Sequence, residues 1–206
     1  LAVAVGELVS ARLDRARLER SLEDARRTAE RASSEDPVTG LPNRDLLLDR
    51  LHQAIARDRR TERSTALLIA DLRDLRRIND AYGHAVADRL LRMVANRLAE
   101  TVRDMDTVGR LGGGEFALIA PAIETIADAE ALVERIETLS DLPYEMDGVT
   151  LHPRFAVGVA LAPADAEEPR DLLRNAELAL TRAKAADDRA VAWFMHDVDD
   201  ERRERS

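Results

Sequence analysis

Residues Arg110-Leu-Gly-Gly-Gly-Glu-Phe116 place three consecutive glycines between two apolar stretches. The first stretch ends at Leu111, and the second is Phe116-Ala-Leu-Ile-Ala120. Two short apolar segments joined by Gly-rich residues are typical of a β-hairpin. Glycines at the tip let the backbone approach a ligand closely, as phosphate sites require, and Glu115 adds a carboxylate beside the turn. Taken alone, the pattern is more typical of a simple turn, so whether it marks a ligand site depends on the other motifs of the chain.

The composition restricts the class of protein. The chain has 206 residues, 45% hydrophobic and 34% charged, which suits one globular domain with an appended segment. Its net charge of −9 argues against DNA or RNA as a partner, because proteins that neutralise nucleic-acid phosphates are usually basic. Cysteine is absent, which excludes disulfides and Cys-ligated metals. No apolar run reaches the roughly 18 residues of a membrane helix, so we expect a cytoplasmic domain, within a full-length protein that could be membrane-anchored.

The first 34 residues carry a heptad-like pattern of small and apolar side chains. Spacings of four and three alternate at Leu18, Leu22, Ala25, Ala29 and Ala32. Such a seam is typical of a coiled coil, and we expect residues 1–34 to form a signalling helix that supports a homodimer and leads out of an upstream sensor. A helix that packs on its own domain is the alternative. Because the seam is short and Ala-rich, dimerisation through it alone would be weak.

Strand and helix patterns alternate through the rest of the chain. The segment Asp36-Pro-Val-Thr-Gly-Leu-Pro-Asn-Arg44 breaks the first helix, and Asp45 is a candidate N-cap for the next. The expected elements are a helix over 45–59, a strand over 65–70, a helix over 76–102, hairpin strands over 107–111 and 115–121, a helix over 125–139, strand residues within 149–162, a helix over 169–186 and a short strand over 190–195.

The order β-α-β-β-α-β predicts a mixed α/β fold, namely a ferredoxin-like or palm-type sandwich with an added hairpin and helix. We place this domain at residues 35–195. Residues 196–206 are acidic and Arg-rich, and we expect them to form a linker to a further domain.

Polar residues gather after the first strand and in the helix behind it. Asp71 stands at the end of the strand, where a carboxylate is well placed to bind a cation, and Asn79 and Asp88 fall in the first turns of the next helix. Lys184, the one lysine of the chain, lies near the end of the last helix. Together with the Gly-rich hairpin and the segment 36–44, these residues make the stretch 36–195 resemble the GGDEF domain of diguanylate cyclases.

The resemblance implies an activity and its cofactor. GGDEF domains condense two molecules of GTP into cyclic di-GMP at an active site shared across a dimer. The resemblance further implies that the Asp71 carboxylate and the Leu72 carbonyl are ligands of the Mg²⁺ (or Mn²⁺) that accompanies GTP. Oxygen ligands of this kind are the ones that Mg²⁺ prefers.

The resemblance also implies how the substrate is held. An asparagine supplies both a donor and an acceptor to the guanine edge, and a carboxylate accepts from the guanine N1–H and N2–H groups. The glycine backbone and the lysine would meet the phosphates. The substrate-binding residues implied in this way are Asn79, Asp88, Gly112, Gly113 and Lys184.

Three departures from the family pattern weaken the expected activity. The family signature is Gly-Gly-Asp/Glu-Glu-Phe, whereas Gly114 here replaces the carboxylate that serves as metal ligand and base, and only Glu115 remains of the acidic pair. Arg73 puts a positive charge where a second acid is common, and Asp188 stands where an arginine usually binds phosphate. The signature positions implied in catalysis are therefore Gly114 and Glu115, in degenerate form.

An accessory motif precedes the hairpin. Arg103-Asp-Met-Asp106 matches Arg-x-x-Asp, which is the inhibitory product site of the family, at the family's offset from the signature. An arginine can bind phosphate or guanine acceptors in a bidentate manner, and Asp106 can accept from guanine. The resemblance thus implies an allosteric site at Arg103 and Asp106. A surface ion pair of little energetic value is the alternative.

These features favour a degenerate GGDEF domain of cyclic di-GMP signalling, a catalytically weak or inactive regulatory module that binds GTP, cyclic di-GMP or both. One alternative is an active diguanylate cyclase, with Glu115 or Asp74 as substitute ligand. A second is a structural dimerisation or transmission module. The tail that starts at Phe194 is similar in charge pattern to connectors that lead into an EAL phosphodiesterase domain, so we expect such a domain downstream.

Overall fold

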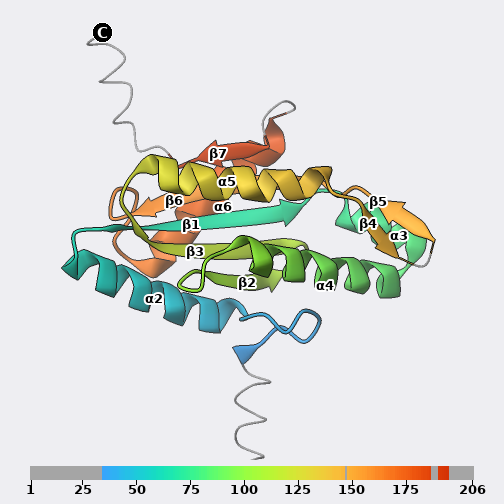
Figure 1. Cartoon of the computed structure of the whole chain (residues 1–206), viewed down its shortest axis with the longest axis horizontal. Coiled ribbons are helices and arrows are strands. Elements are labelled where there is room, and N and C mark those ends of the chain that lie inside the picture. Colours follow the sequence, from blue (N-terminus) through green and yellow to red (C-terminus); the bar gives the residue numbers. More distant parts are fainter. Residues whose placement is uncertain (1–33, 147, 187–189, 195–206) are drawn as a thin grey trace, which may run out of the picture.

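A computed structural model describes residues 34–146, 148–186 and 190–194 (Figure 1). Its elements in chain order are α2 (Arg44–Arg60), β1 (Ser64–Leu72), α3 (Leu75–Tyr82), α4 (His84–Thr101), β2 (Thr107–Gly112), β3 (Glu115–Ile123), α5 (Ile126–Asp141), β4 (Tyr144–Met146), β5 (Val149–Leu151), β6 (Phe155–Ala162), α6 (Pro169–Ala185) and β7 (Val191–Trp193). The heptad seam, Asp188 and the tail 196–206 lie outside the described residues.

The predicted ferredoxin-like α/β sandwich is confirmed. The main sheet has the strand order β2-β3-β1-β6-β7, in which β6 and β7 are parallel and the other neighbouring pairs antiparallel. The β-α-β-β-α-β core consists of β1, the pair α3 and α4, the hairpin β2-β3, α5 and β6. The hairpin β4-β5, helix α2 and the unit α6-β7 are added to this core.

Strand β1 lies at the centre of the sheet and is buried on both faces. Leu68 and Ala70 belong to the core cluster that includes residues of α4 and α5, whereas Leu67 and Ile69 belong to the cluster that includes residues of α2 and α6. Because successive side chains of a strand point to opposite faces, a strand covered on both faces must be apolar throughout. This explains why β1 appears in the sequence as a continuous apolar run that ends abruptly at a carboxylate.

The structure corrects three local expectations. The single helix expected over 76–102 is two helices, α3 and α4, separated by Gly83 with φ of 83°. The strand β4 was not anticipated. The cap of α2 is Asn43, whose Oδ1 accepts from the backbone N–H groups of Asp45 and Leu46, so Asp45 is a first-turn acid and not the cap.

Helix α6 packs unusually closely on β6. A Cβ atom at Gly158 of β6 would collide with the Leu180 nitrogen and the Ala176 carbonyl oxygen of α6, which are backbone atoms that cannot move aside. A glycine is therefore required at this crossing, and it fixes the height of α6 above the sheet. The helix ends near Asp71, which decides where Lys184 lies.

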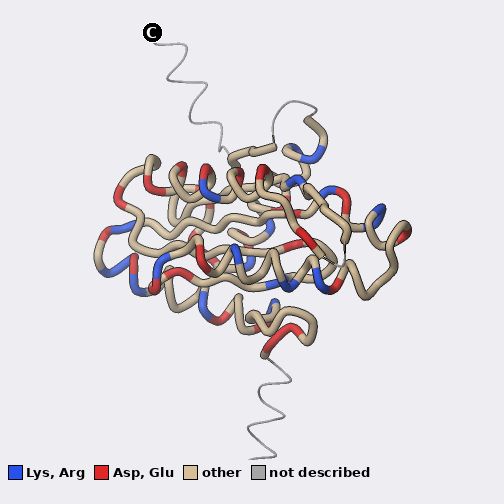
Figure 2. The backbone as a smooth tube through the Cα atoms, turned by 45° about the vertical axis from the view of Figure 1, so that its right-hand side comes forward, with Lys and Arg blue, Asp and Glu red and all other residues tan. Residues whose placement is uncertain are grey.

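Within the described ranges, no helix combines the length and the apolar character that a bilayer span needs. Acidic and basic residues are interspersed over the same part of the chain (Figure 2). A phosphate-binding band for a nucleic acid would require basic residues to be concentrated on one face.

Candidate functional site

The glycine-rich turn joins β2 and β3 as the sequence predicts. Gly112 pairs with Glu115, and φ is 135° at Gly112 and 53° at Gly113. These are backbone conformations that residues with a Cβ atom rarely adopt, so the two glycines are needed for the turn itself. The adjacent Gly114 is buried, and two clusters of polar residues contact the turn.

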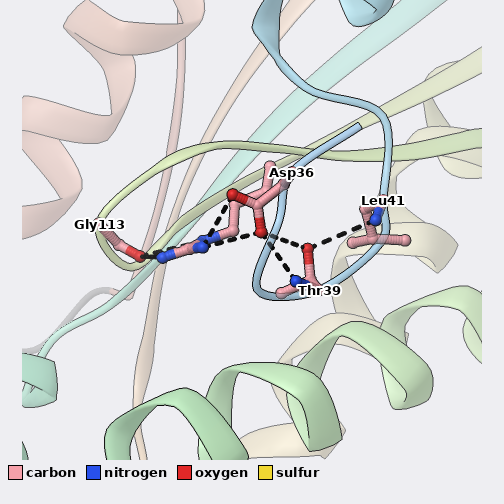
Figure 3. A network of polar contacts seen from close by, with 5 residues as sticks. Asp36, Thr39, Leu41 and Gly113 are labelled. Atoms are coloured by element: carbon pink, nitrogen blue, oxygen red, sulfur yellow. Dashed lines mark hydrogen bonds and ion pairs between the residues drawn. The ribbon is translucent and has the colours of Figure 1, made fainter. Parts of the chain in front are cut away.

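The first cluster, which we call the Arg110 cluster, consists of Asp36, Thr39, Arg110 and Gly113 (Figure 3). Nη1 of Arg110 lies 2.8 and 3.0 Å from the two carboxylate oxygens of Asp36, and its Nη2 donates to the Gly113 carbonyl over 2.7 Å. The Thr39 hydroxyl and N–H donate to Asp36 over 2.7 and 2.9 Å. The cluster therefore ties the glycine turn to the segment that precedes α2.

Burial and charge act in opposite directions on the Asp36 carboxyl. Burial alone would raise its pKa, but the hydrogen bonds from Arg110 and Thr39 and the charge of Arg110 outweigh that effect, and the pKa is lowered. Only 9% of the Arg110 side chain and 15% of the Asp36 side chain are exposed. Because the pair is buried, removing either partner would leave an uncompensated charge in the interior and destabilise the turn.

The second cluster, which we call the Lys184 cluster, consists of Asp71, Glu115 and Lys184. Asp71 and Glu115 are register partners on β1 and β3, so their side chains start from the same face of the sheet. The Lys184 ammonium lies 3.2 Å from Asp71 Oδ2 and 3.2 Å from Glu115 Oε1. The structure thus brings together three residues predicted for the site, and the lysine lies between the two acids.

Position 114 immediately precedes Glu115, and a side chain there would contact Leu72 and Leu75. A Cβ atom on Gly114 would sit 3.3 Å from the Leu72 carbonyl oxygen and 3.2 Å from the Leu72 Cβ. The Leu72 N–H donates to the Gly114 carbonyl over 3.1 Å. A side chain at 114 would therefore start next to the carbonyl that the resemblance implies as a metal ligand. Glycine leaves that place without a carboxylate.

Arg73 contacts the end of α6. Its Nη2 donates to the backbone carbonyls of Ala183 and Lys184 over 3.1 and 2.8 Å. A cation at a helix C-terminus is favourable because it compensates the unpaired carbonyls and the negative end of the helix dipole. Arg73 thus stabilises the last turn of α6, which is the turn that carries Lys184.

The residues present do not fit a site for two Mg²⁺ ions. Mg²⁺ requires several oxygen ligands in near-octahedral geometry. Asp71 and Glu115 are the two carboxylates of the Lys184 cluster, and both are paired with the Lys184 ammonium. Across the described residues, no group of three or more His, Asp or Glu side chains is arranged to hold a metal ion. Asp74, the residue before α3, lies 3.8 Å from Arg77.

The two predicted guanine-reading residues belong to consecutive helices and not to one helix. Asn79 lies in α3 and Asp88 in α4, on either side of the break at Gly83. The Asn79 Oδ1 atom is buried and accepts no hydrogen bond from the described residues. A buried acceptor without a partner costs free energy, and a ligand donor would remove that cost.

The accessory motif forms a turn before β2. The Arg103 N–H donates to Asp106 Oδ2 over 2.9 Å, and the Arg103 side chain is exposed. Burial raises the pKa of the Asp106 carboxyl, against the smaller lowering effects of Arg103 and Arg135. A neighbouring pocket of about 260 Å³ is lined by Asp106 and, from α2, by Arg50 and Arg57. Asp104 lines the same pocket, so two guanidinium groups and two carboxylates are available there to a ligand.

The family described as "Diguanylate cyclase, GGDEF domain" matches residues 33–190. The chain belongs to the GGDEF family. The bifunctional diguanylate cyclase/cyclic di-GMP phosphodiesterase MucR of Pseudomonas aeruginosa is 41% identical over 164 residues, which are 80% of this chain and 24% of MucR. The cyclic di-GMP phosphodiesterase NbdA of the same organism is 34% identical over 163 residues, 79% of this chain and 21% of NbdA.

Solved GGDEF structures agree with this assignment. The GGDEF domain of TpbB from Pseudomonas aeruginosa superposes with a TM-score of 0.75 at 32% identity and covers 84% of this chain and 99% of that one. A sensory box/GGDEF family protein from Caulobacter crescentus gives 0.71 at 36% identity, over 74% of this chain and 98% of that one. This chain thus matches nearly the whole length of those two solved chains but only about a quarter or less of MucR and NbdA.

The sequence predicted the composition of the Lys184 cluster but missed the Arg110 cluster. Arg110 and Asp36 are 74 positions apart, and neither carries a catalytic pattern. The signal was present, because an arginine before the glycines and an aspartate before a Pro-rich turn are both candidates for a buried pair. The contact of Arg73 with α6 likewise depends on tertiary structure.

Proposed function

We propose that this GGDEF domain is a catalytically weak or inactive regulatory module of cyclic di-GMP signalling that binds GTP, cyclic di-GMP or both. The observation that carries the proposal is Gly114, which lies beside the Leu72 carbonyl and supplies no carboxylate. Loss of a metal-binding carboxylate can remove several kcal/mol of transition-state stabilisation, roughly a thousandfold or more in rate. An active cyclase is the competing function, and turnover by the unmodified protein would favour it.

The base-binding half of the site is the part that we propose is kept. The orphaned Asn79 Oδ1 supports a donor from the ligand, and guanine N2–H is such a donor. Asp88 follows in the next helix and can accept from N1–H. The phosphates would lie toward the glycine turn. Any Mg²⁺ (or Mn²⁺) would arrive as the counter-ion of the GTP triphosphate, because the protein's own carboxylates are paired with Lys184.

We place cyclic di-GMP at the Arg103-to-Asp106 turn. The exposed Arg103 guanidinium can bind a phosphate or guanine in a bidentate manner, and Asp106 can accept from guanine. Arg50 and Arg57 line the adjoining pocket together with Asp104 and Asp106, so guanidinium groups for phosphates and carboxylates for guanine N–H groups are both present. This site is separate from the Lys184 cluster, so its occupancy does not require catalysis.

We infer that the domain works within a longer protein. MucR and NbdA, which it matches over less than a quarter of their length, are named for phosphodiesterase activity, which supports an EAL domain downstream. An upstream sensor and a homodimer formed through residues 1–34 remain predictions from the heptad pattern. Light scattering at one concentration should give a larger mass for the whole chain than for a chain that starts at Ser34, and equal masses would contradict dimerisation through this segment.

Calorimetry with GTP and with cyclic di-GMP, each with and without Mg²⁺, tests the proposed binding. Asn79→Ala should weaken GTP binding and leave cyclic di-GMP binding unchanged, whereas Arg103→Ala should abolish cyclic di-GMP binding and leave GTP binding unchanged. Arg174→Ala, an exposed change on α6, is the matched control for both. No heat with either ligand at millimolar concentration would contradict the proposal and favour a purely structural module.

A further inference from the structure

The Lys184 ammonium occupies the place between the two remaining carboxylates of the site. It lies at the same distance, 3.2 Å, from Asp71 and from Glu115. Two carboxylates that are direct partners on adjacent antiparallel strands repel one another unless a cation lies between them. Divalent ions and ammonium groups are alternative ways to provide that cation. In this protein the chain itself provides it.

Two features of the fold hold the lysine there. Gly158 lets α6 approach β6 to backbone contact, and Arg73 binds the carbonyls of Ala183 and Lys184 in the last turn of α6. Arg73 is only two residues from Asp71, so the end of β1 supplies a carboxylate to the ammonium and the residue directly after β1 supplies a guanidinium to its backbone. The lysine is therefore fixed from both ends and is not an unconstrained surface side chain.

We propose that Lys184 acts as a built-in counter-ion in place of divalent metal, so that guanine-nucleotide binding by this domain does not depend on divalent cations. The inference deepens, and rests on, the proposed nucleotide-binding function. Gly114 and Arg73 contribute to the same result, since the first removes a metal-binding carboxylate and the second anchors the residue that neutralises the others. A divalent ion that bridged Asp71 Oδ2 and Glu115 Oε1 would have to displace the ammonium from both oxygens.

The first test uses Mn²⁺ alone, without nucleotide, and measures free Mn²⁺ by electron paramagnetic resonance. The wild-type protein should bind no Mn²⁺ at this site at millimolar concentration. Lys184→Met, which keeps an unbranched side chain but removes the charge, should bind Mn²⁺ at least about tenfold more tightly, because Asp71 and Glu115 are then unpaired. Asp71→Asn added to Lys184→Met should remove the gain, and Arg174→Met on the same helix should behave as wild type.

Equal Mn²⁺ affinity in wild type and Lys184→Met, whether both bind or neither does, would overturn the inference.

A second measurement avoids substitution altogether. Because Lys184 is the one lysine of the chain, labelling with [¹⁵N]lysine gives one side-chain Nζ signal. Equimolar Mn²⁺ should leave this signal sharp in the wild type, and paramagnetic broadening to disappearance would show that the metal binds beside the ammonium and would overturn the inference.

Measurements of GTP binding with and without Mg²⁺ distinguish this inference from the proposed function. GTP should bind the wild type with the same dissociation constant in EDTA as in excess Mg²⁺, and Lys184→Met should acquire a dependence on Mg²⁺. Tighter GTP binding by the wild type in Mg²⁺, by tenfold or more, would overturn metal independence while supporting nucleotide binding. Absence of GTP binding in both buffers would overturn nucleotide binding, and metal independence with it, while the Mn²⁺ experiments would still decide whether Lys184 takes the place of the ion.

Discussion

The Arg110 cluster and the Lys184 cluster contact the same glycine turn, yet they differ in burial and completeness. The Arg110 pair is buried and its donors and acceptors are satisfied, whereas the Lys184 and Glu115 side chains are 38% and 36% exposed and the neighbouring position 114 has no side chain. The first cluster holds the turn in shape, and the second occupies the place where chemistry is expected. The difference teaches that one glycine turn can be held by a buried, satisfied ion pair on one side and bordered by a more exposed cluster of charges on the other.

The largest effect should come from breaking the Arg110 cluster. Asp36→Ala leaves a buried guanidinium without its partner and should lower the free energy of unfolding by about 3–5 kcal/mol. Glu177→Ala removes an exposed ion pair with Arg44 and should cost about 0–1 kcal/mol. Urea denaturation of both variants measures the comparison, and a similar small loss for each would show that the cluster does not stabilise the turn.

Substitutions at two glycines should cause smaller losses of stability, and the two losses should differ. Gly158→Ala forces a methyl group into the backbone of α6 and should cost about 3 kcal/mol, because neither backbone can yield. Gly114→Ala meets Leu72 and Leu75 at 3.2 to 3.3 Å, which small shifts can relieve, and should cost about 1 kcal/mol. Thermal unfolding of the two variants distinguishes them. The reverse order would mean that position 114 cannot accept a side chain and that its alignment with the family's acidic residue is wrong.

A smaller effect should appear in the pH dependence of stability. The pKa of Asp36 is lowered in the folded protein, so its contribution is present above the pKa of the unfolded chain and is lost as pH falls through the folded value. The difference in free energy of unfolding between wild type and Asp36→Asn should therefore be constant near neutral pH and shrink in acid. Denaturation from about pH 7 to pH 3 measures it. A difference that grows in acid would contradict the assignment.

Most of the fold could be predicted from the sequence because its signals are local. The run Thr65–Ala70 has the length of a strand, and the three glycines mark the hairpin. The break at Gly83 was missed because one glycine inside a helical pattern is often tolerated. Strand β4 was missed because three residues give too little alternation to recognise.

The candidate site was less predictable, because its contacts join distant parts of the chain. Asp71 and Lys184 could be named from their motifs, but the placement of the ammonium between Asp71 and Glu115 depends on strand register and on the height of α6. Arg73 appeared in the sequence only as an unexpected charge, and its partners are carbonyls 110 and 111 positions away. Backbone carbonyls leave no trace in a sequence pattern.

The central claim is that the Gly114 site no longer supports catalysis, and turnover by the unmodified protein tests it most directly. The protein, at high concentration, is incubated for many hours with GTP and Mg²⁺, and the nucleotides are separated by chromatography beside a parallel reaction with the diguanylate cyclase TpbB. The wild-type chain should yield little or no cyclic di-GMP, and the GTP should remain unconverted. Robust cyclic di-GMP formation would contradict the account and show that the missing carboxylate is dispensable.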